Sequence, residues 1–262
     1  MPVAKGASTS YIIQNIQDLV NKYNQLYSTY VHDYKCFIGE RTRLLMVNDG
    51  SFVKLLSDPR FSHQLHDILT KFGMNARASE LASRQRFLDT ISEVSSEFDL
   101  LNAARIQLYT LNLHQMLDGR TVDSIVRNIF NLFEMPSQLS VAGGFVVASK
   151  TMHFVMPELF VMLDGQHIGI SLYNISDYYP HPDDGRDWFD VIPNYSGRKP
   201  NPSPRGEGRR LWDDERYCIA LIYYKRIIQE WCQQNNSNIE GFLDLDTQCA
   251  SKAARVIDKA LW

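Results

Sequence analysis

Apolar residues recur at steps of three and four along most of this chain, which is the period of an amphipathic α-helix. The pattern opens with a stripe from Ser10 to about Tyr34 that is rich in isoleucine, valine and tyrosine. We expect its five tyrosines, counting Tyr11, to be core residues with hydroxyls at the rim rather than a binding surface. These segments carry little strand signal, so the sequence predicts an all-α fold. The same period predicts further helices at about 61–72, 77–97 and 101–117, from Thr121 to the residues before Pro136, from Asp213 or Asp214 to Gln233, and from Thr247 onward.

The middle of the chain combines a glycine turn, a helix and a short apolar run. A helix that opens after Gly144 carries Lys150 and ends before Pro157, because proline cannot supply the N–H that the next helical turn needs. The apolar run 159–163 is short enough to cross a core, and Asp164 follows it at a position suited to capping the next helix. This order predicts that the amine of Lys150 and the carboxylate of Asp164 share one pocket.

A long segment at 176–210 interrupts the helical pattern. It holds six of the ten prolines and four of the fourteen glycines, so neither a helix nor a regular strand runs through it. Two interpretations stand: a loop that covers a substrate, or a disordered insertion. The segment is too aromatic for a plain linker, and its second half is basic; the residues concerned include Trp188, Phe189, Arg198, Lys199, Arg209 and Arg210.

Composition narrows the class of protein. Apolar residues make up 44% of the 262 residues, an ordinary globular value, and we expect 1–262 to form one helical unit of two packed lobes. The formal charge of −3 argues against broad nonspecific nucleic-acid binding but leaves a local basic patch open. No stretch is apolar enough for a membrane span or a signal peptide, so we expect a cytoplasmic protein. The four cysteines lie too far apart for a metal site, and we expect reduced thiols and no bound metal.

A carboxylate beside an amine suits chemistry at a glycosidic carbon. When a base departs from its sugar, positive charge develops on the sugar, and a carboxylate such as Asp164 stabilises it. The carboxylate can also orient a water, or assist Lys150 in attacking the sugar carbon to form a Schiff base. The competing interpretation is structural, with Asp164 as a helix cap only and Lys150 as a solvated side chain.

The same residues resemble the active-site region of helix-hairpin-helix DNA glycosylases, in particular the 8-oxoguanine-glycosylase-like branch. In that family a lysine lies at the start of the second helix of the motif, and an aspartate follows at the head of the next helix. The resemblance implies that Lys150 matches the Schiff-base lysine, that Asp164 matches the catalytic aspartate, and that the fold is the two-lobed glycosylase fold. It covers 121–173 and is carried by Ser149–Lys150, His153–Phe154, Leu163–Asp164 and His167–Ile168.

Further site residues are expected around this pair. Glycines before a helix leave backbone N–H groups free to face a phosphate, which makes Gly143 and Gly144 candidates for DNA contact together with Ser149. The basic residues Arg198, Lys199, Arg209 and Arg210 are candidates for contacts with the DNA backbone. For His153 and His167 the competing interpretation is a satisfied core or rim histidine. The candidates for the substrate pocket are His153, Gln166, His167, Trp188 and Phe189.

The sequence therefore predicts a DNA glycosylase that flips out and excises a modified base. Its expected partner is double-stranded DNA containing such a base, and we expect a monomer without a cofactor. The aromatic, charged segment 176–210 suggests a bulky modified base of foreign (phage) DNA, and a role in antiviral defence would fit. Whether Lys150 or a water is the nucleophile stays open. The alternatives are a non-catalytic nucleic-acid-binding helical protein and a helical module that binds a protein or a small ligand.

Overall fold

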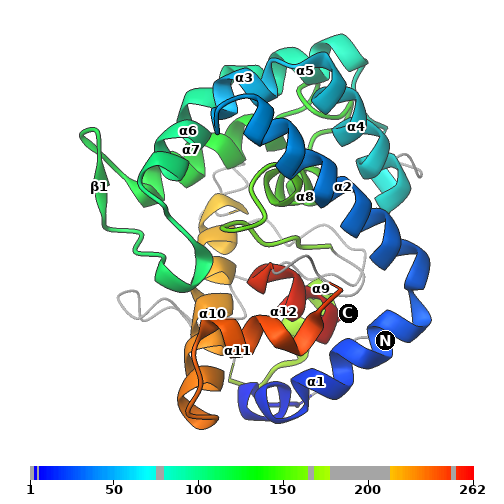
Figure 1. Ribbon diagram of the computed structural model, residues 1–262, viewed down its shortest axis with the longest axis vertical. Helices are drawn as coiled ribbons and strands as arrows, with labels where there is room; N and C mark the ends of the chain where they lie inside the picture. The colour runs from blue at the N-terminus through cyan, green and yellow to red at the C-terminus, as the bar shows by residue number, and fades with distance from the viewer. Residues whose placement is uncertain (1–2, 5, 75–79, 165–167, 178–212, 249–251) are drawn as a thin grey trace, which may run out of the picture.

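The protein is almost entirely helical in the part of the chain that its structure, a computed structural model, describes: residues 3–4, 6–74, 80–164, 168–177, 213–248 and 252–262 (Figure 1). The all-α prediction is confirmed. A π-helical turn, η1 (Thr70–Met74), two 3₁₀ turns, η2 (Leu108–Thr110) and η4 (Asp244–Asp246), and a hairpin of β1 (Met116–Leu117) and β2 (Arg120–Thr121) complete it. The α-helices are α1 (Thr9–Leu26), α2 (Ser28–Val47), α3 (Phe52–Leu56), α4 (Pro59–Leu69), α5 (Arg84–Glu93), α6 (Ser95–Ala103), α7 (Val122–Glu134), α8 (Phe145–Val155), α9 (Ile168–Asn174), α10 (Asp213–Gln234), α11 (Ile239–Leu243) and α12 (Ala253–Leu261).

The two helices on which the site prediction depends begin and end where the sequence predicts. Thr121 caps α7 by accepting a hydrogen bond from the backbone N–H of Ser124 at 3.1 Å. α8 follows Gly144 and ends at Val155, before Pro157. Capping residues and prolines suffice to predict the ends of these two helices, because both act within one helical turn.

Other predicted boundaries are wrong. The helix expected from Ser10 to Tyr34 divides at Tyr27, whose φ of −125° and ψ of 37° separate α1 from α2. The helix expected at 101–117 ends at Ala103, because Arg105 adopts a left-handed φ of 53° and the N–H of Ile106 turns back to the carbonyl of Leu101 at 3.0 Å. The helices expected at 61–72 and 77–97 are replaced by α4 followed by η1 and by α5 with the start of α6, and α12 begins at Ala253 rather than at Thr247. By contrast, α10 matches the helix predicted from Asp213 or Asp214 to Gln233.

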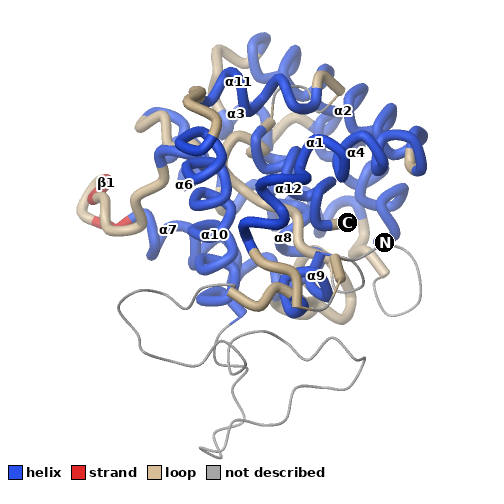
Figure 2. Tube along the Cα trace, turned by 90° about the horizontal axis from the view of Figure 1, so that it is seen from below, coloured by secondary structure: helices blue, strands red, loops and turns tan. Residues whose placement is uncertain are grey.

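The helices form two groups around one continuous hydrophobic core (Figure 1), and Figure 2 shows the same helices from below. One group holds α2 to α8, and the other, which we call the terminal group, holds α1 and α9 to α12. α1 packs on α12, while α10 packs on α7 and joins the two groups. α8 lies in the middle, and all of its residues from Val147 to Val155 are buried. No helix in the described ranges is long and apolar enough to cross a membrane.

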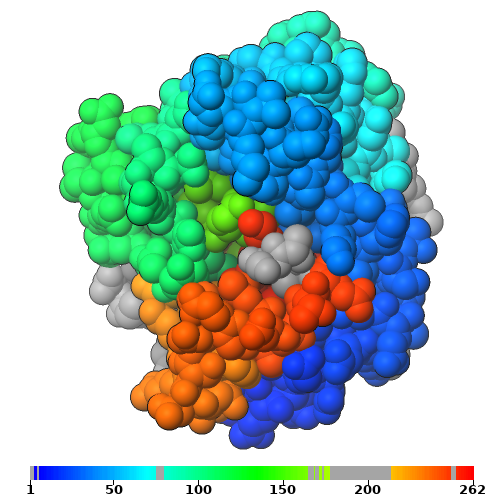
Figure 3. All heavy atoms as spheres, viewed as in Figure 1, coloured from blue at the N-terminus to red at the C-terminus, as the bar shows by residue number. Residues whose placement is uncertain are grey.

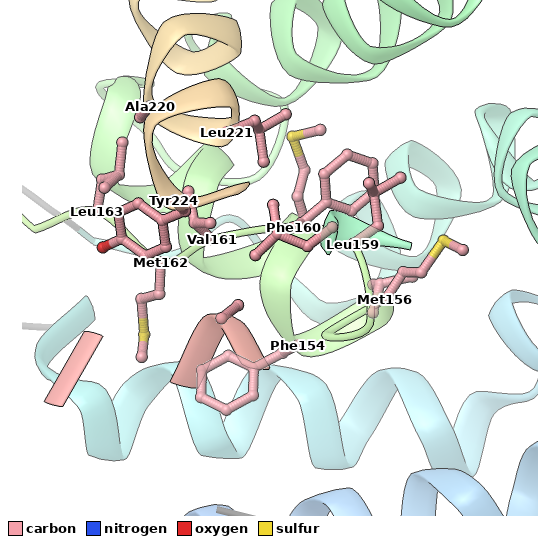
Figure 4. Packing of buried hydrophobic residues seen from close by; sticks show 14 of the residues in the cluster. Phe154, Met156, Leu159, Phe160, Val161, Met162, Leu163, Ala220, Leu221 and Tyr224 are labelled. Atoms are coloured by element: carbon pink, nitrogen blue, oxygen red, sulfur yellow. The ribbon is translucent and has the colours of Figure 1, made fainter. Parts of the chain in front are cut away.

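An extended segment, Leu159–Leu163, runs through this helical core, and all five of its side chains are buried (Figure 4). Buried backbone groups need partners. A turn at Leu159 pairs the N–H groups of Leu159 and Phe160 with the carbonyl of Met156 at 3.1 and 3.0 Å, and side chains supply the partners that follow. The ring of His153 binds the carbonyl of Phe160 at 2.7 Å, the hydroxyl of Tyr217 donates to the carbonyl of Val161 at 3.0 Å, and Ser149 binds both polar backbone groups of Leu163. The sequence prediction of a run that crosses the core is confirmed.

Replacing Tyr217 with phenylalanine should lower the free energy of unfolding by about 1–3 kcal/mol, because the buried carbonyl of Val161 loses its partner. Urea unfolding followed by circular dichroism would measure the loss. Tyr11→Phe is the matched control, since Tyr11 is 47% exposed and its change should cost almost nothing. Equal effects of the two substitutions would contradict the view that side chains hold the extended segment.

Candidate functional site

Lys150 lies in the second turn of α8 and is only 6% exposed. Its ammonium group donates to the backbone carbonyl of Phe72 in η1 at 2.7 Å. Burial lowers the pKa of Lys150 because desolvation penalises the charged form, while the carboxylate of Asp164 opposes this shift and the charge of Arg255 adds to it. The interpretation of Lys150 as a solvated side chain is therefore wrong.

Asp164 ends the extended segment and is 7% exposed. Its position is fixed from one side, because the hydroxyl of Ser149 donates to the carbonyl of Leu163 at 2.9 Å and accepts from the N–H of Leu163 at 3.3 Å. Residues 165–167, between Asp164 and α9, lie outside the described residues, so the cap expected at Asp164 stays a prediction. The charge of Asp164 acts on the pKa of Lys150, so the two buried groups lie near each other, while the pocket that they are expected to share stays a prediction.

Ser149 was predicted to contact DNA, and the structure corrects this. Its side chain is fully buried, and its hydroxyl is engaged with the backbone of Leu163 and with the carbonyl of Val146 at 3.2 Å. A phosphate has no access to a hydroxyl in this position. Ser149 instead holds the end of the extended segment in place, and so positions Asp164.

His153 was a candidate for the substrate pocket, and it is a core residue instead. Its ring is fully buried, with Nδ1 at 2.7 Å from the carbonyl of Phe160 and Nε2 at 3.0 Å from the hydroxyl of Tyr34. Burial lowers the pKa of His153 to about 3, so the ring is neutral. Nδ1 then carries the proton and donates to Phe160, while Nε2 accepts from Tyr34. Both nitrogens are used within the protein.

The glycine turn before α8 also differs from the prediction. Gly143 and Gly144 have φ of 69° and 126°, and a Cβ on Gly143 would lie 2.3 Å from the carbonyl oxygen of Glu134. Their N–H groups are not free for a phosphate, because Gly143 donates to Ser140 at 3.3 Å and Gly144 to Glu134 at 2.8 Å. The first turn of α8 keeps its own amide donors at Phe145 and Val146, which are half-buried and make no hydrogen bond within the described part of the chain.

Several predicted site residues lie outside the described residues, and their roles stay predictions. Among the residues that are described, no group of three or more His, Cys, Asp or Glu side chains has the arrangement of a metal site. The predicted site residues that are not described are Gln166, His167, Trp188, Phe189, Arg198, Lys199, Arg209 and Arg210.

α12 brings two further charged residues to the same region, and neither is among the site residues predicted from the sequence. Arg255 is fully buried, and its guanidinium group donates to the hydroxyl of Tyr23 at 2.8 Å. Asp258, one turn further along α12, is also fully buried and accepts from the hydroxyl of Tyr224 at 3.0 Å. Every residue of α12 is buried. In the sequence, the sign of this is that charged side chains are spaced among apolar ones, but charged side chains usually face solvent, so their burial could not be predicted.

Lys150, Asp164, Arg255 and Asp258 form what we call the buried charge cluster: two basic and two acidic residues, all buried, whose charges act on one another's pKa values. Burial raises the pKa of Asp258 to about 7, the charge of Arg255 and the hydroxyl of Tyr224 oppose this shift, and the charge of Asp164 adds to it. Two carboxyl groups in different environments within one site are a common feature of acid–base catalysts.

Asp258→Asn should make the protein less sensitive to pH. The folded pKa of Asp258, about 7, lies above the value near 3.9 of an unfolded aspartate, so the wild type loses stability as the pH rises through this window. The asparagine keeps an acceptor for Tyr224 and carries no titrating proton. Between pH 5 and pH 8 the stability of the wild type should fall relative to the variant by about 2 kcal/mol. Urea unfolding across this range would show it, and parallel pH profiles would contradict it.

Comparisons of the chain with protein-family models, with curated proteins and with solved structures gave no match. The resemblance to helix-hairpin-helix glycosylases thus stands on the residues quoted for it.

Proposed function

We propose that the protein is a DNA glycosylase that cleaves the N-glycosidic bond of a modified base, with Asp164 as its catalytic carboxylate. The observation that carries this proposal is the placement of Asp164 at the end of a side-chain-braced extended segment, in a buried region beside Lys150. When the base departs, a carboxylate held in this way stabilises the positive charge on the sugar. Because its position is fixed in advance, little reorganisation is needed during the reaction.

The geometry favours water over Lys150 as the nucleophile. The resemblance gives a lysine to the start of the second motif helix, but α8 begins with Phe145, and Lys150 lies in the next turn. The amine of Lys150 is buried and bound to the carbonyl of Phe72, whereas an attacking amine must reach the sugar carbon. In this proposal Asp164 orients the water, and Lys150 supplies a positive charge beside it.

The N-terminus of α8 offers a place for the DNA backbone. The amide groups of Phe145 and Val146 and the positive end of the helix dipole suit a phosphate. With a formal charge of −3 the protein would depend on such local contacts rather than on an overall basic surface. A flipped base would then enter from the duplex, and a bulky modified base of phage DNA remains the proposed substrate.

A second candidate is a nucleic-acid-binding protein without turnover. The burial of Asp164 and the bond from Lys150 to Phe72 favour it, since both groups are engaged within the protein. Base release from a panel of duplexes, each with one modified base, separates the two candidates. Release of any one base would establish the glycosylase.

Asp164→Asn should lower the rate of base release by about 10²–10³-fold, because the amide keeps the shape of the side chain but not its charge. DNA affinity and the melting temperature should stay close to those of the wild type. Asp49→Asn serves as the control, since Asp49 is a highly exposed carboxylate far along the chain from the site. Wild-type turnover in Asp164→Asn would remove Asp164 from the chemistry.

Borohydride reduction during turnover tests the nucleophile. If water attacks, no covalent DNA adduct should form, and Lys150→Met should still release the base, although more slowly because the buried carboxylate of Asp164 loses the opposite charge beside it. Gel electrophoresis of the reduced reaction would reveal any adduct. An adduct that forms with the wild type and disappears in Lys150→Met would instead identify Lys150 as a Schiff-base nucleophile.

A further inference from the structure

Arg255 makes no ion pair among the described residues, although the charge of Asp258 acts on it, and aromatic rings surround its guanidinium group. The centre of its guanidinium group lies 5.0 Å from the ring centres of Tyr23 and Tyr34 and 5.9 Å from that of Phe72. These three rings come from α1, α2 and η1, and we call them, with Arg255, the Arg255 cage. Cation–π contacts of this kind stabilise the positive charge. They do not replace directional hydrogen bonds.

Two donors of Arg255 lack hydrogen-bond partners. Nη2 donates to Tyr23, but Nε and Nη1 are buried and have no acceptor within the described part of the chain. Arg41, another buried arginine, shows the usual arrangement: its Nε donates to the carbonyl of Val155 at 2.7 Å, and its two Nη atoms donate to Glu158 at 2.9 and 3.0 Å. A buried donor without an acceptor costs stability, so the open donors of Arg255 call for an explanation.

Further aromatic rings connect the cage with the surface. The rings of Tyr23, Tyr27 and Trp262 contact one another, with ring centres 4.9 to 5.9 Å apart, and Tyr30 packs edge-on against Phe72 at 5.3 Å. Tyr30 is 38% exposed, whereas Tyr27 and Trp262 are half-buried. In Figure 3, yellow-green atoms from the middle of the chain are set back between the blue, green and orange surfaces of the two helix groups.

We propose that the Arg255 cage is a binding subsite for a neutral planar ring, and that Nε and Nη1 of Arg255 recognise hydrogen-bond acceptors on the edge of that ring. This inference rests on the proposed function, in which the ring is the extruded base. Aromatic side chains stack on any base, so selectivity must come from polar groups. Arginine only donates, and so it selects bases with a carbonyl at the edge over bases with an amino group there.

The charges around the cage favour a neutral ligand over an anion. Arg255 lies in the buried charge cluster, where its charge acts on Lys150 and Asp258, and above about pH 7, where Asp258 is ionised, the cluster contains two basic groups and two carboxylates. An anion such as a phosphate would add an uncompensated charge to a buried site. A carbonyl group supplies the missing hydrogen-bond acceptor without adding a charge.

Nucleosides that differ in one edge group provide the test. Inosine carries a carbonyl group where adenosine carries an amino group, and uridine and cytidine differ in the same way. Calorimetric titration of the full chain at pH 8, above the pKa of Asp258, should show inosine and uridine binding about tenfold more tightly than their partners. Arg255→Lys keeps the charge but alters the donors, and it should reduce this preference to less than threefold. Arg41→Lys, the control at the bonded arginine, should keep the preference.

Other outcomes separate this inference from the proposed function. Equal affinities within each pair, or an undiminished preference in Arg255→Lys, would overturn the subsite. If the nucleoside preference depends on Arg255 but no base is released from any DNA, the subsite is supported and the glycosylase proposal is wrong. If bases are released with the same preference by the wild type and by Arg255→Lys, the glycosylase proposal is supported and the subsite is wrong. If Arg255→Lys does not fold, Tyr23→Phe, which frees the bonded Nη2, should alter the preference.

Discussion

An extended backbone that crosses a helical core has no neighbouring strand to pair with, and this constraint organises the protein. Leu159–Leu163 meets it with hydrogen bonds from His153, Tyr217 and Ser149, which come from the helices on either side. An unpaired buried carbonyl would cost about 1–3 kcal/mol, so these three side chains are not free for other roles. The same bonds fix where the segment ends, and therefore where Asp164 lies.

Much of the fold could be predicted from the sequence because its signals are local. Helical periodicity, the cap at Thr121 and the stop at Pro157 each act within a few residues, and they located α7 and α8. The end of α6 escaped prediction because Arg105 takes a left-handed conformation that usually calls for glycine or asparagine. Likewise, nothing near Tyr27 in the sequence marks the break between α1 and α2.

The candidate site could be predicted only in part. Lys150 and Asp164 were found because they stand close together in the sequence, next to a glycine turn and an apolar run. Their electrostatic partners stand about a hundred residues further on, in α12, where periodicity alone assigns charged side chains to solvent. The roles of His153 and Ser149 could not be predicted either. Both bind the backbone of the segment Leu159–Leu163, and these hydrogen bonds exist only in the folded state.

The packing of α1 on α12 has a consequence for how the molecule folds. Arg255 bonds to Tyr23 across 232 residues, and Lys259 bonds to Asn24 across 235 residues. Closing a loop of this length costs about 5 kcal/mol of chain entropy, so contacts within the α2 to α8 group have a kinetic advantage. We expect the helices around α8 to assemble first, with Asp164 already near Lys150, while the two remaining members of the buried charge cluster arrive with the docking of α12. Burial of the charges then becomes a late event on the folding pathway.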